Sequence, residues 1–152
     1  MKSINGIEWL EIFKTAYDIA EKAHEGQVDK AGAPYINHPI RVSNSFNATK
    51  VEERTVALLH DVLEDSSLTA DDLVHMGIPR YIVDCVEAVT KKPGEDYSAF
   101  IVRCGSHPIP RAVKLADLDD NLDVKRLVRL EHKDLERINR YLEARRYLLE
   151  KQ

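Results

Sequence analysis

Apolar residues recur at helical spacing along most of this chain. From Trp9 to Ala23 an apolar residue returns every three or four positions, which gives that segment one apolar face. The same spacing predicts further helices over 51–65, 80–90, 109–122 and 131–150, and shorter ones from near 38, between 69 and 77, and over 96–104. Alternation with a period of two, which is typical of half-buried strands, is absent from the sequence. The pattern therefore predicts an all-α fold.

Capping and proline signals mark where these helices begin. Thr69 and Asp72 have the spacing of a capping box, with Asp in place of the usual Glu. Pro39 and Pro79 suit the first turns of the helices that they precede or open. Because the chain shows neither internal repeats nor an interdomain linker, residues 1–152 are predicted to form one compact domain.

Composition narrows the classes of function. The formal net charge is -4, whereas nucleic-acid binders usually carry a basic excess, so no nucleic-acid partner is expected. A small anionic substrate is compatible with this charge, because a metal ion can supply the positive charge locally. No apolar run approaches the ~20 residues of a membrane span, and charges interrupt the N-terminal segment, so a cytoplasmic protein without a membrane partner is expected.

The strongest chemical signal is the doublet His60-Asp61 within the apolar helix predicted over 51–65. Burying such a pair is costly unless something satisfies it. Glu64 lies four residues after His60 and shares its helix face, and Asp65 has the same relation to Asp61. A charged outer face with a satisfied histidine is the alternative interpretation. Three acids beside one histidine on a helix this apolar favour a functional site.

A second polar cluster lies near the end of the predicted helix over 109–122. Asp117 and Asn121 are four residues apart on one helix face, and Asp117 follows a run that reads as buried. Asp119 and Asp120 fit a position on the helix surface better. His38 stands at the start of its predicted helix, where a lone histidine is often structural.

Together these residues resemble a known pattern. His38, His60-Asp61 and Asp117 are similar to the H…HD…D pattern of the HD superfamily. The stretches GAPYINHP, LLHDVLED and VKLADLDDN resemble, in order and spacing, the hydrolase domain of RelA/SpoT proteins and of the small stand-alone alarmone hydrolases, the metazoan SpoT homologue included. The resemblance runs from about residue 14 to 128 and implies a compact, all-α HD-domain helical bundle.

The resemblance implies a metal-dependent nucleotide phosphohydrolase that removes the 3′-pyrophosphate from (p)ppGpp. The residues it implies are His38, His60, Asp61 and Asp117 as ligands of one divalent ion, Glu64 and Asp65 as catalytic acids, and Lys30 and Asn121 as substrate contacts. Manganese is the metal it implies. Two imidazoles and two carboxylates would also suit Fe, Zn or Ni, and differ from an all-oxygen calcium site. Either catalytic acid could orient or deprotonate the attacking water.

Two positions depart from the family. Where relatives have an Arg-Lys pair before the first ligand histidine, this chain has Asp29 and Lys30, and where they often have a basic residue it has Asp123. Carboxylates there remove stacking on the base and repel phosphates, which predicts weakened guanine recognition. An HD-type phosphatase for another nucleotide, such as a nucleoside monophosphate or an adenine alarmone, is therefore the alternative. A catalytically silent nucleotide-binding domain is disfavoured because no ligand residue is lost.

Two further features are interpreted as unrelated to the site. The mixed charges of 131–151 are expected to form a solvated helix face. Lys91 and Lys92 lie in a predicted loop and are expected to be ordinary solvated lysines. The oligomeric state is not indicated by any pattern in the sequence.

Overall fold

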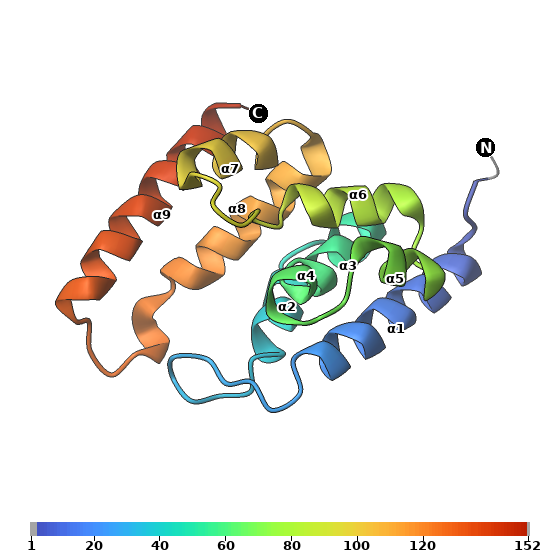
Figure 1. Ribbon diagram of the computed structural model, residues 1–152, viewed down its shortest axis with the longest axis horizontal. Helices are drawn as coiled ribbons and strands as arrows, with labels where there is room; N and C mark the ends of the chain where they lie inside the picture. The colour runs from blue at the N-terminus through green and yellow to red at the C-terminus, as the bar shows by residue number, and fades with distance from the viewer. Residues whose placement is uncertain (1–2, 152) are drawn as a thin grey trace.

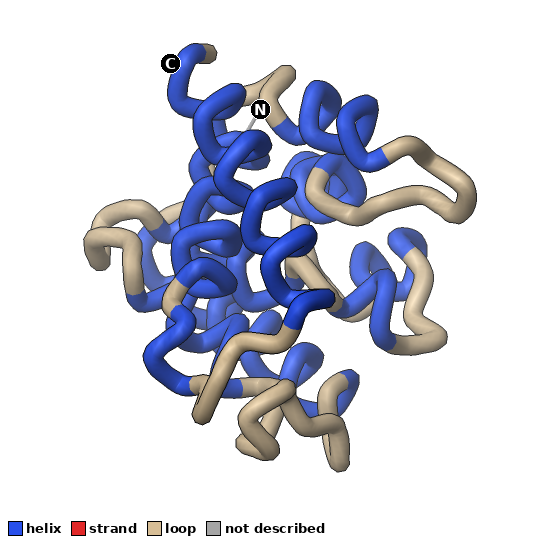
Figure 2. Tube along the Cα trace, turned by 90° about the vertical axis from the view of Figure 1, so that its left-hand side faces the viewer, coloured by secondary structure: helices blue, strands red, loops and turns tan. Residues whose placement is uncertain are grey.

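The computed structural model describes residues 3–151, and within them the regular structure is helical apart from one isolated bridge between Val28 and Pro34. The elements are α1 (Gly6–Ala23), α2 (Asn37–Asn44), α3 (Val51–Leu59), α4 (Val62–Asp65), α5 (Ala70–His75), α6 (Arg80–Ala88), α7 (Tyr97–Cys104), α8 (Pro108–Leu122), the 3-10 turn η1 (Val124–Arg126) and α9 (His132–Glu150). Figure 2 shows the described chain as helices joined by loops. The predicted all-α fold is confirmed.

The predicted helix starts are confirmed by their caps. The Thr69 hydroxyl accepts the backbone N–H of Asp72, and the Asp72 carboxylate accepts the backbone N–H of Thr69, so α5 begins with the predicted capping box. Pro79 is the N-cap of α6, and Pro39 lies in the first turn of α2. Most other predicted bounds agree with the structure to within two residues, since hydrophobic spacing and capping chemistry point to the same positions.

One predicted helix is interrupted at the residues that matter most. The single helix predicted over 51–65 is wrong, because α3 ends at Leu59 and α4 begins only at Val62. In a continuous helix the Ala57 carbonyl would accept the N–H of Asp61, but this carbonyl lies 2.6 Å from His60 Nδ1. A side chain that binds a nearby backbone group competes with the helix in this way. His60 and Asp61 therefore occupy a turn. Their side chains are not separated by the rotation of about 100° that neighbouring residues have on a continuous helix.

The core is built around α3. Its residues from Thr55 to Leu59 are buried, and α3 packs against α1, α2, α6 and α8. Figure 1 shows α1 and α9 on opposite sides of the molecule, with α3 and α8 between them. The C-terminal helix α9 packs on α8 and α7. None of the described helices is long and apolar enough to cross a membrane.

The loop between α1 and α2 is held by a turn at Gly32 and by the side chain of Asp29. Gly32 has a φ of +83°, a conformation that residues with a Cβ rarely adopt. The Asp29 carboxylate accepts the backbone N–H groups of Ala31 and Ala33 at 2.9 and 3.0 Å. These bonds form a tight turn that leads the chain into α2, on which His38 lies.

Candidate metal centre and the cavity beside it

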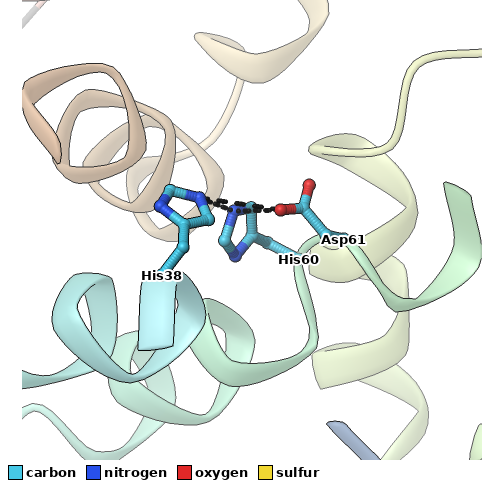
Figure 3. Close-up of side chains that lie close together, drawn as sticks. All are labelled: His38, His60 and Asp61. Atoms are coloured by element: carbon cyan, nitrogen blue, oxygen red, sulfur yellow. Dashed lines mark hydrogen bonds and ion pairs between the residues drawn. The ribbon is translucent and has the colours of Figure 1, made fainter. Parts of the chain in front are cut away.

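Side chains from distant parts of the chain meet at one buried point. His38 comes from the first turn of α2, and His60 and Asp61 come from the turn between α3 and α4. Figure 3 shows the two imidazoles and the Asp61 carboxylate directed toward one another. The Nε2 atoms of His38 and His60 are 3.1 Å apart, and Asp61 Oδ2 lies 3.1 Å from His60 Nε2 and 3.6 Å from His38 Nε2.

The fourth predicted ligand, Asp117, reaches the same point from α8. Its Oδ1 atom lies 3.0 Å from His38 Nε2 and 3.4 Å from His60 Nε2. Both histidines and Asp117 are buried. The ligand atoms of His38, His60 and Asp61 all lie within 4.8 Å of one another, which is compatible with a shared metal ion. The structure thus brings together the four residues that the resemblance implied as ligands.

Hydrogen bonds on the far side of each imidazole decide which nitrogen faces this point. His38 Nδ1 lies 2.7 Å from Asp120 Oδ2, and His60 Nδ1 lies 2.6 Å from the Ala57 carbonyl oxygen. A carboxylate and a carbonyl can only accept, so each Nδ1 must donate its hydrogen. In the neutral form of each ring, Nε2 then presents a lone pair to the other ring at 3.1 Å. Two facing lone pairs beside two carboxylates are unfavourable without positive charge between them, and a divalent metal ion fits this donor set.

The electrostatics of the cluster also favour a bound cation. Burial alone lowers the pKa of His60, but Asp61 and Asp117 outweigh burial and raise it well above the usual value. Burial alone raises the pKa of Asp61, yet the facing imidazoles of His60 and His38 outweigh this and lower the pKa to about 2. The carboxylates are thus held ionised around a point that attracts positive charge.

Both carboxylates also accept hydrogen bonds from neighbouring side chains. Tyr35 donates its hydroxyl hydrogen to Asp61 Oδ2 at 2.6 Å. Lys114 Nζ donates to Asp117 Oδ2 at 2.7 Å, and Asn121 Nδ2 donates to Asp117 Oδ1 at 3.0 Å. Sequence reasoning missed Tyr35 and Lys114, although each stands three residues before a predicted ligand. Asn121, predicted as a substrate contact, lies against the Asp117 carboxylate and also lines the cavity described next.

A cavity of about 520 Å³ opens beside the cluster. Its wall includes the predicted substrate residue Lys30 and the predicted catalytic residue Glu64. The opposite side is formed in part by α9, through Arg137, Arg140 and Tyr141. The charges of α9, expected to form a solvated helix face, thus also contribute to the lining of this cavity. Side chains that sequence reasoning treated as surface charges bring positive charge to the cavity.

Glu64 is fixed at the cavity by a backbone group from another loop. Its Oε1 atom accepts the N–H of Lys91 at 2.6 Å, so Lys91 contributes to the site through its backbone. Burial raises the pKa of Glu64, and the neighbouring Asp61 adds to this effect. Burial also raises the pKa of Asp65, which lines a neighbouring groove together with Glu64. The predicted acidic doublet thus lies one turn beyond Asp61, with Glu64 nearer the cavity.

Three of the aspartates that sequence analysis treated as outside the metal site have specific partners. Asp29 is occupied by the loop bonds described above. Asp123 caps η1 through the N–H of Lys125 and lies 3.5 Å from an Arg126 guanidinium nitrogen. Asp120, predicted to be a surface acid, instead contacts His38 and is mostly buried. The prediction for Asp120 is wrong because the side of α8 that carries it faces α2.

Comparison with known proteins gives the chain its relatives. No family model matches it. The GTP pyrophosphokinase of Myxococcus xanthus is 30% identical over 128 residues, which are 74% of this chain and 17% of that protein. The guanosine-3′,5′-bis(diphosphate) 3′-pyrophosphohydrolase of Aquifex aeolicus is 32% identical over 122 residues, again 74% of this chain and 17% of that protein. The bifunctional (p)ppGpp synthase/hydrolase SpoT of Escherichia coli is 39% identical over 80 residues, which are 51% of this chain and 11% of that protein.

The chain therefore spans less than a fifth of the length of these curated relatives. Their names include both synthesis and hydrolysis, so a name alone does not say what the matched part does. A solved structure of a metazoan orthologue of SpoT, described as hydrolysing ppGpp and acting in starvation responses, has the same fold. It aligns with a TM-score of 0.73 at 22% identity, over 99% of this chain and 88% of that chain. By sequence and by fold, the chain belongs to the family of RelA/SpoT-type HD domains.

Proposed function

We propose that this chain is a metal-dependent phosphohydrolase that removes the 3′-pyrophosphate from guanosine-3′,5′-bis(diphosphate). The observation that carries the proposal is the convergence of His38, His60, Asp61 and Asp117 beside a cavity whose lining includes lysine and arginine side chains. A pyrophosphate ester needs both features, a site for a metal ion at the scissile group and positive charge for the other phosphates. Relatives named for hydrolysis of this nucleotide support the choice of substrate.

The metal would be held by the two Nε2 atoms and the carboxylates of Asp61 and Asp117. Manganese is the ion we propose, with Fe, Zn and Ni as ions that the same ligand set accepts. The ion would supply Lewis acidity toward a phosphoryl oxygen and lower the pKa of the attacking water. Tyr35 and Lys114 donate hydrogen bonds to the carboxylates of Asp61 and Asp117 and so orient them.

The chain's own groups carry the remaining steps. Glu64, fixed by the Lys91 N–H, would accept a proton from the attacking water, and its raised pKa suits a general base. Asp65 would orient the same water. Lys30, Arg140 and Arg137 lie on the cavity wall, where they would neutralise phosphate charge. Arg140 is held over the Tyr97 ring at 4.7 Å, which leaves its guanidinium ordered at this wall.

A hydrolysis assay on a panel of nucleotides with added Mn²⁺ tests the proposal. We expect ppGpp to be cleaved to GDP and pyrophosphate, with ppApp cleaved as well and nucleoside monophosphates left intact. Cleavage of a nucleoside monophosphate without cleavage of any 3′-pyrophosphorylated nucleotide would contradict it.

The metal site has its own test in metal content. His60→Ala and Asp61→Ala each remove a group at the centre of the cluster, so both purified variants are expected to lose bound Mn²⁺. His75→Ala is the matched control. His75 is exposed, and its one hydrogen-bond partner within the described residues is the Asp71 carbonyl. Metal content equal to wild type in both site variants would refute the ligand assignment.

An HD-type phosphatase for another nucleotide is the second candidate, and Asp29 is the observation that favours it. Asp29→Asn separates the two, because the amide oxygen can still accept the N–H groups of Ala31 and Ala33 while the negative charge is lost. If ppGpp is the substrate, its KM should fall by about two- to fivefold, since a repulsive interaction worth ~1 kcal/mol or less is removed. If Asp29 selects a different nucleotide, the Asp29→Asn substitution should raise the KM for that nucleotide and leave ppGpp a poor substrate.

A further inference from the structure

Two neighbouring aspartates on α8 have opposite surroundings. The Asp119 side chain is 55% exposed and pairs with Arg145 at 2.6 Å. The Asp120 side chain is 12% exposed and faces α2, where it meets both His38 and Arg41. The two residues have the same chemistry and stand next to each other on one helix, so any difference between them comes from the face that each occupies.

Asp120 uses both carboxylate oxygens. Its Oδ2 accepts the hydrogen of His38 Nδ1 at 2.7 Å. Arg41 donates from Nε to Oδ1 at 2.8 Å and from Nη2 to Oδ2 at 3.0 Å, a two-point contact that fixes the plane of the carboxylate. Arg126, which lies on the 3-10 turn η1, also donates from its Nη2 atom to Asp120 Oδ2 at 3.3 Å. The carboxylate is therefore oriented by its partners on α2 and η1 and is in turn aimed at one ring nitrogen.

The two ligand histidines differ in what fixes them. His60 donates to a neutral backbone carbonyl, that of Ala57, whereas His38 donates to an ionised carboxylate. A carboxylate behind an imidazole fixes the tautomer and the ring orientation, and it makes the opposite nitrogen a stronger donor to a metal ion. Arg41 stands three residues after His38 on the same helix, so the histidine and the arginine that orients Asp120 lie on one face of α2.

We infer that Asp120 is a positioning residue of the metal centre, which holds His38 with Nε2 toward the ion and is itself held by Arg41. The inference rests on the metal-binding part of the proposed function and needs no particular nucleotide. It also explains why an acid on α8 is directed away from solvent. Asp120 touches neither substrate nor ion in this role and acts through His38 alone.

The test is a titration of the purified, metal-free protein with Mn²⁺ alone, in which free Mn²⁺ is followed by electron paramagnetic resonance. Wild type is compared with Asp120→Ala and Asp120→Asn, and Asp119→Asn serves as the matched control. We expect the dissociation constant for Mn²⁺ to rise about 10- to 100-fold in Asp120→Ala, the usual cost of losing such a partner. Asp120→Asn should be affected less, because its amide oxygen can still accept from His38, and Asp119→Asn should stay within about twofold of wild type.

A purely structural role predicts a different result. It would lower the melting temperature of the metal-free variants and leave the Mn²⁺ affinity of the folded protein unchanged. Asp120→Ala that is folded by circular dichroism and binds Mn²⁺ within about twofold of wild type overturns the inference. If Asp120→Ala does not fold, Arg41→Leu decides by the same criterion. A wild-type protein that binds no Mn²⁺ overturns the proposed metal site itself, and the inference with it, so the two failures are distinguishable.

Discussion

Glu64→Gln is expected to lower kcat by about 10²–10⁴-fold, the usual effect of removing a general base. The glutamine keeps the shape of the side chain, and its amide oxygen can still accept the Lys91 N–H that now holds Glu64 Oε1 at 2.6 Å. It cannot take up a proton from water. Because Glu64 lies outside the four-ligand cluster, bound Mn²⁺ should remain at the wild-type level. Steady-state kinetics on ppGpp together with metal analysis measure both quantities.

Two comparisons make this result specific. Glu87→Gln changes an exposed glutamate that pairs with Arg80 on α6, and its kcat should stay at the wild-type value. Asp65→Asn tests the second acid of the doublet and should reduce kcat less than Glu64→Gln, since Glu64 is the acid that lines the cavity beside the four proposed ligands. Activity within about threefold of wild type in both Glu64→Gln and Asp65→Asn would rule out the assigned role.

Phe100→Ala is expected to cost about 3–5 kcal/mol of unfolding free energy, as for other large-to-alanine changes in a core. The Phe100 ring is 3% exposed, and it lies under the Arg103 guanidinium at 5.5 Å and the Lys114 ammonium at 5.1 Å. Removing the ring leaves a void between α7 and α8 and removes the surface on which Lys114 rests. Urea denaturation of the metal-free protein measures the change.

The neighbouring Val102 provides the control for that measurement. It lies on the same helix, α7, with 53% of its surface exposed, so Val102→Ala should change the unfolding free energy by no more than about 0.5 kcal/mol. Phe100→Leu, which keeps most of the apolar volume, should fall between the two variants. A Phe100→Ala protein as stable as Val102→Ala would mean that the ring does not support the fold as its burial indicates.

Hydrophobic spacing predicted most of the helices, and His60, Asp61 and Asp117 stood out within them as ionisable residues, whereas His38 and the complete set of four proposed ligands came from the resemblance to the HD superfamily. An ionisable side chain such as His60 or Asp117 inside an apolar helical stripe violates the pattern that surrounds it, and the violation is visible without a structure. The same reasoning found the capping box at Thr69, because its two partners are only three residues apart. Local rules of this kind need no knowledge of what the segment packs against.

Features that depend on a competing or distant partner were beyond the same reasoning. The turn at His60-Asp61 arises from a side chain that takes a backbone carbonyl, and hydrophobic periodicity does not register that competition. Asp120 was assigned to the surface together with its neighbour Asp119, although it follows the buried Asp117 by three residues and so lies near it on the helix. The pattern of residues in α9 does not show which other segments the helix faces. Its arginines therefore could not be linked to the cavity from the sequence.

The turn between α3 and α4 and the spread of the ligands over α2, this turn and α8 have a consequence for stability. An ion at this point would act as a noncovalent cross-link between three segments that lie far apart in the sequence. Since the unfolded chain does not assemble the ligands, an ion present at about 100 times its dissociation constant would stabilise the fold by about 2.7 kcal/mol. Melting temperature then becomes a measure of metal affinity, and the lifetime of the folded protein becomes coupled to the supply of its ion.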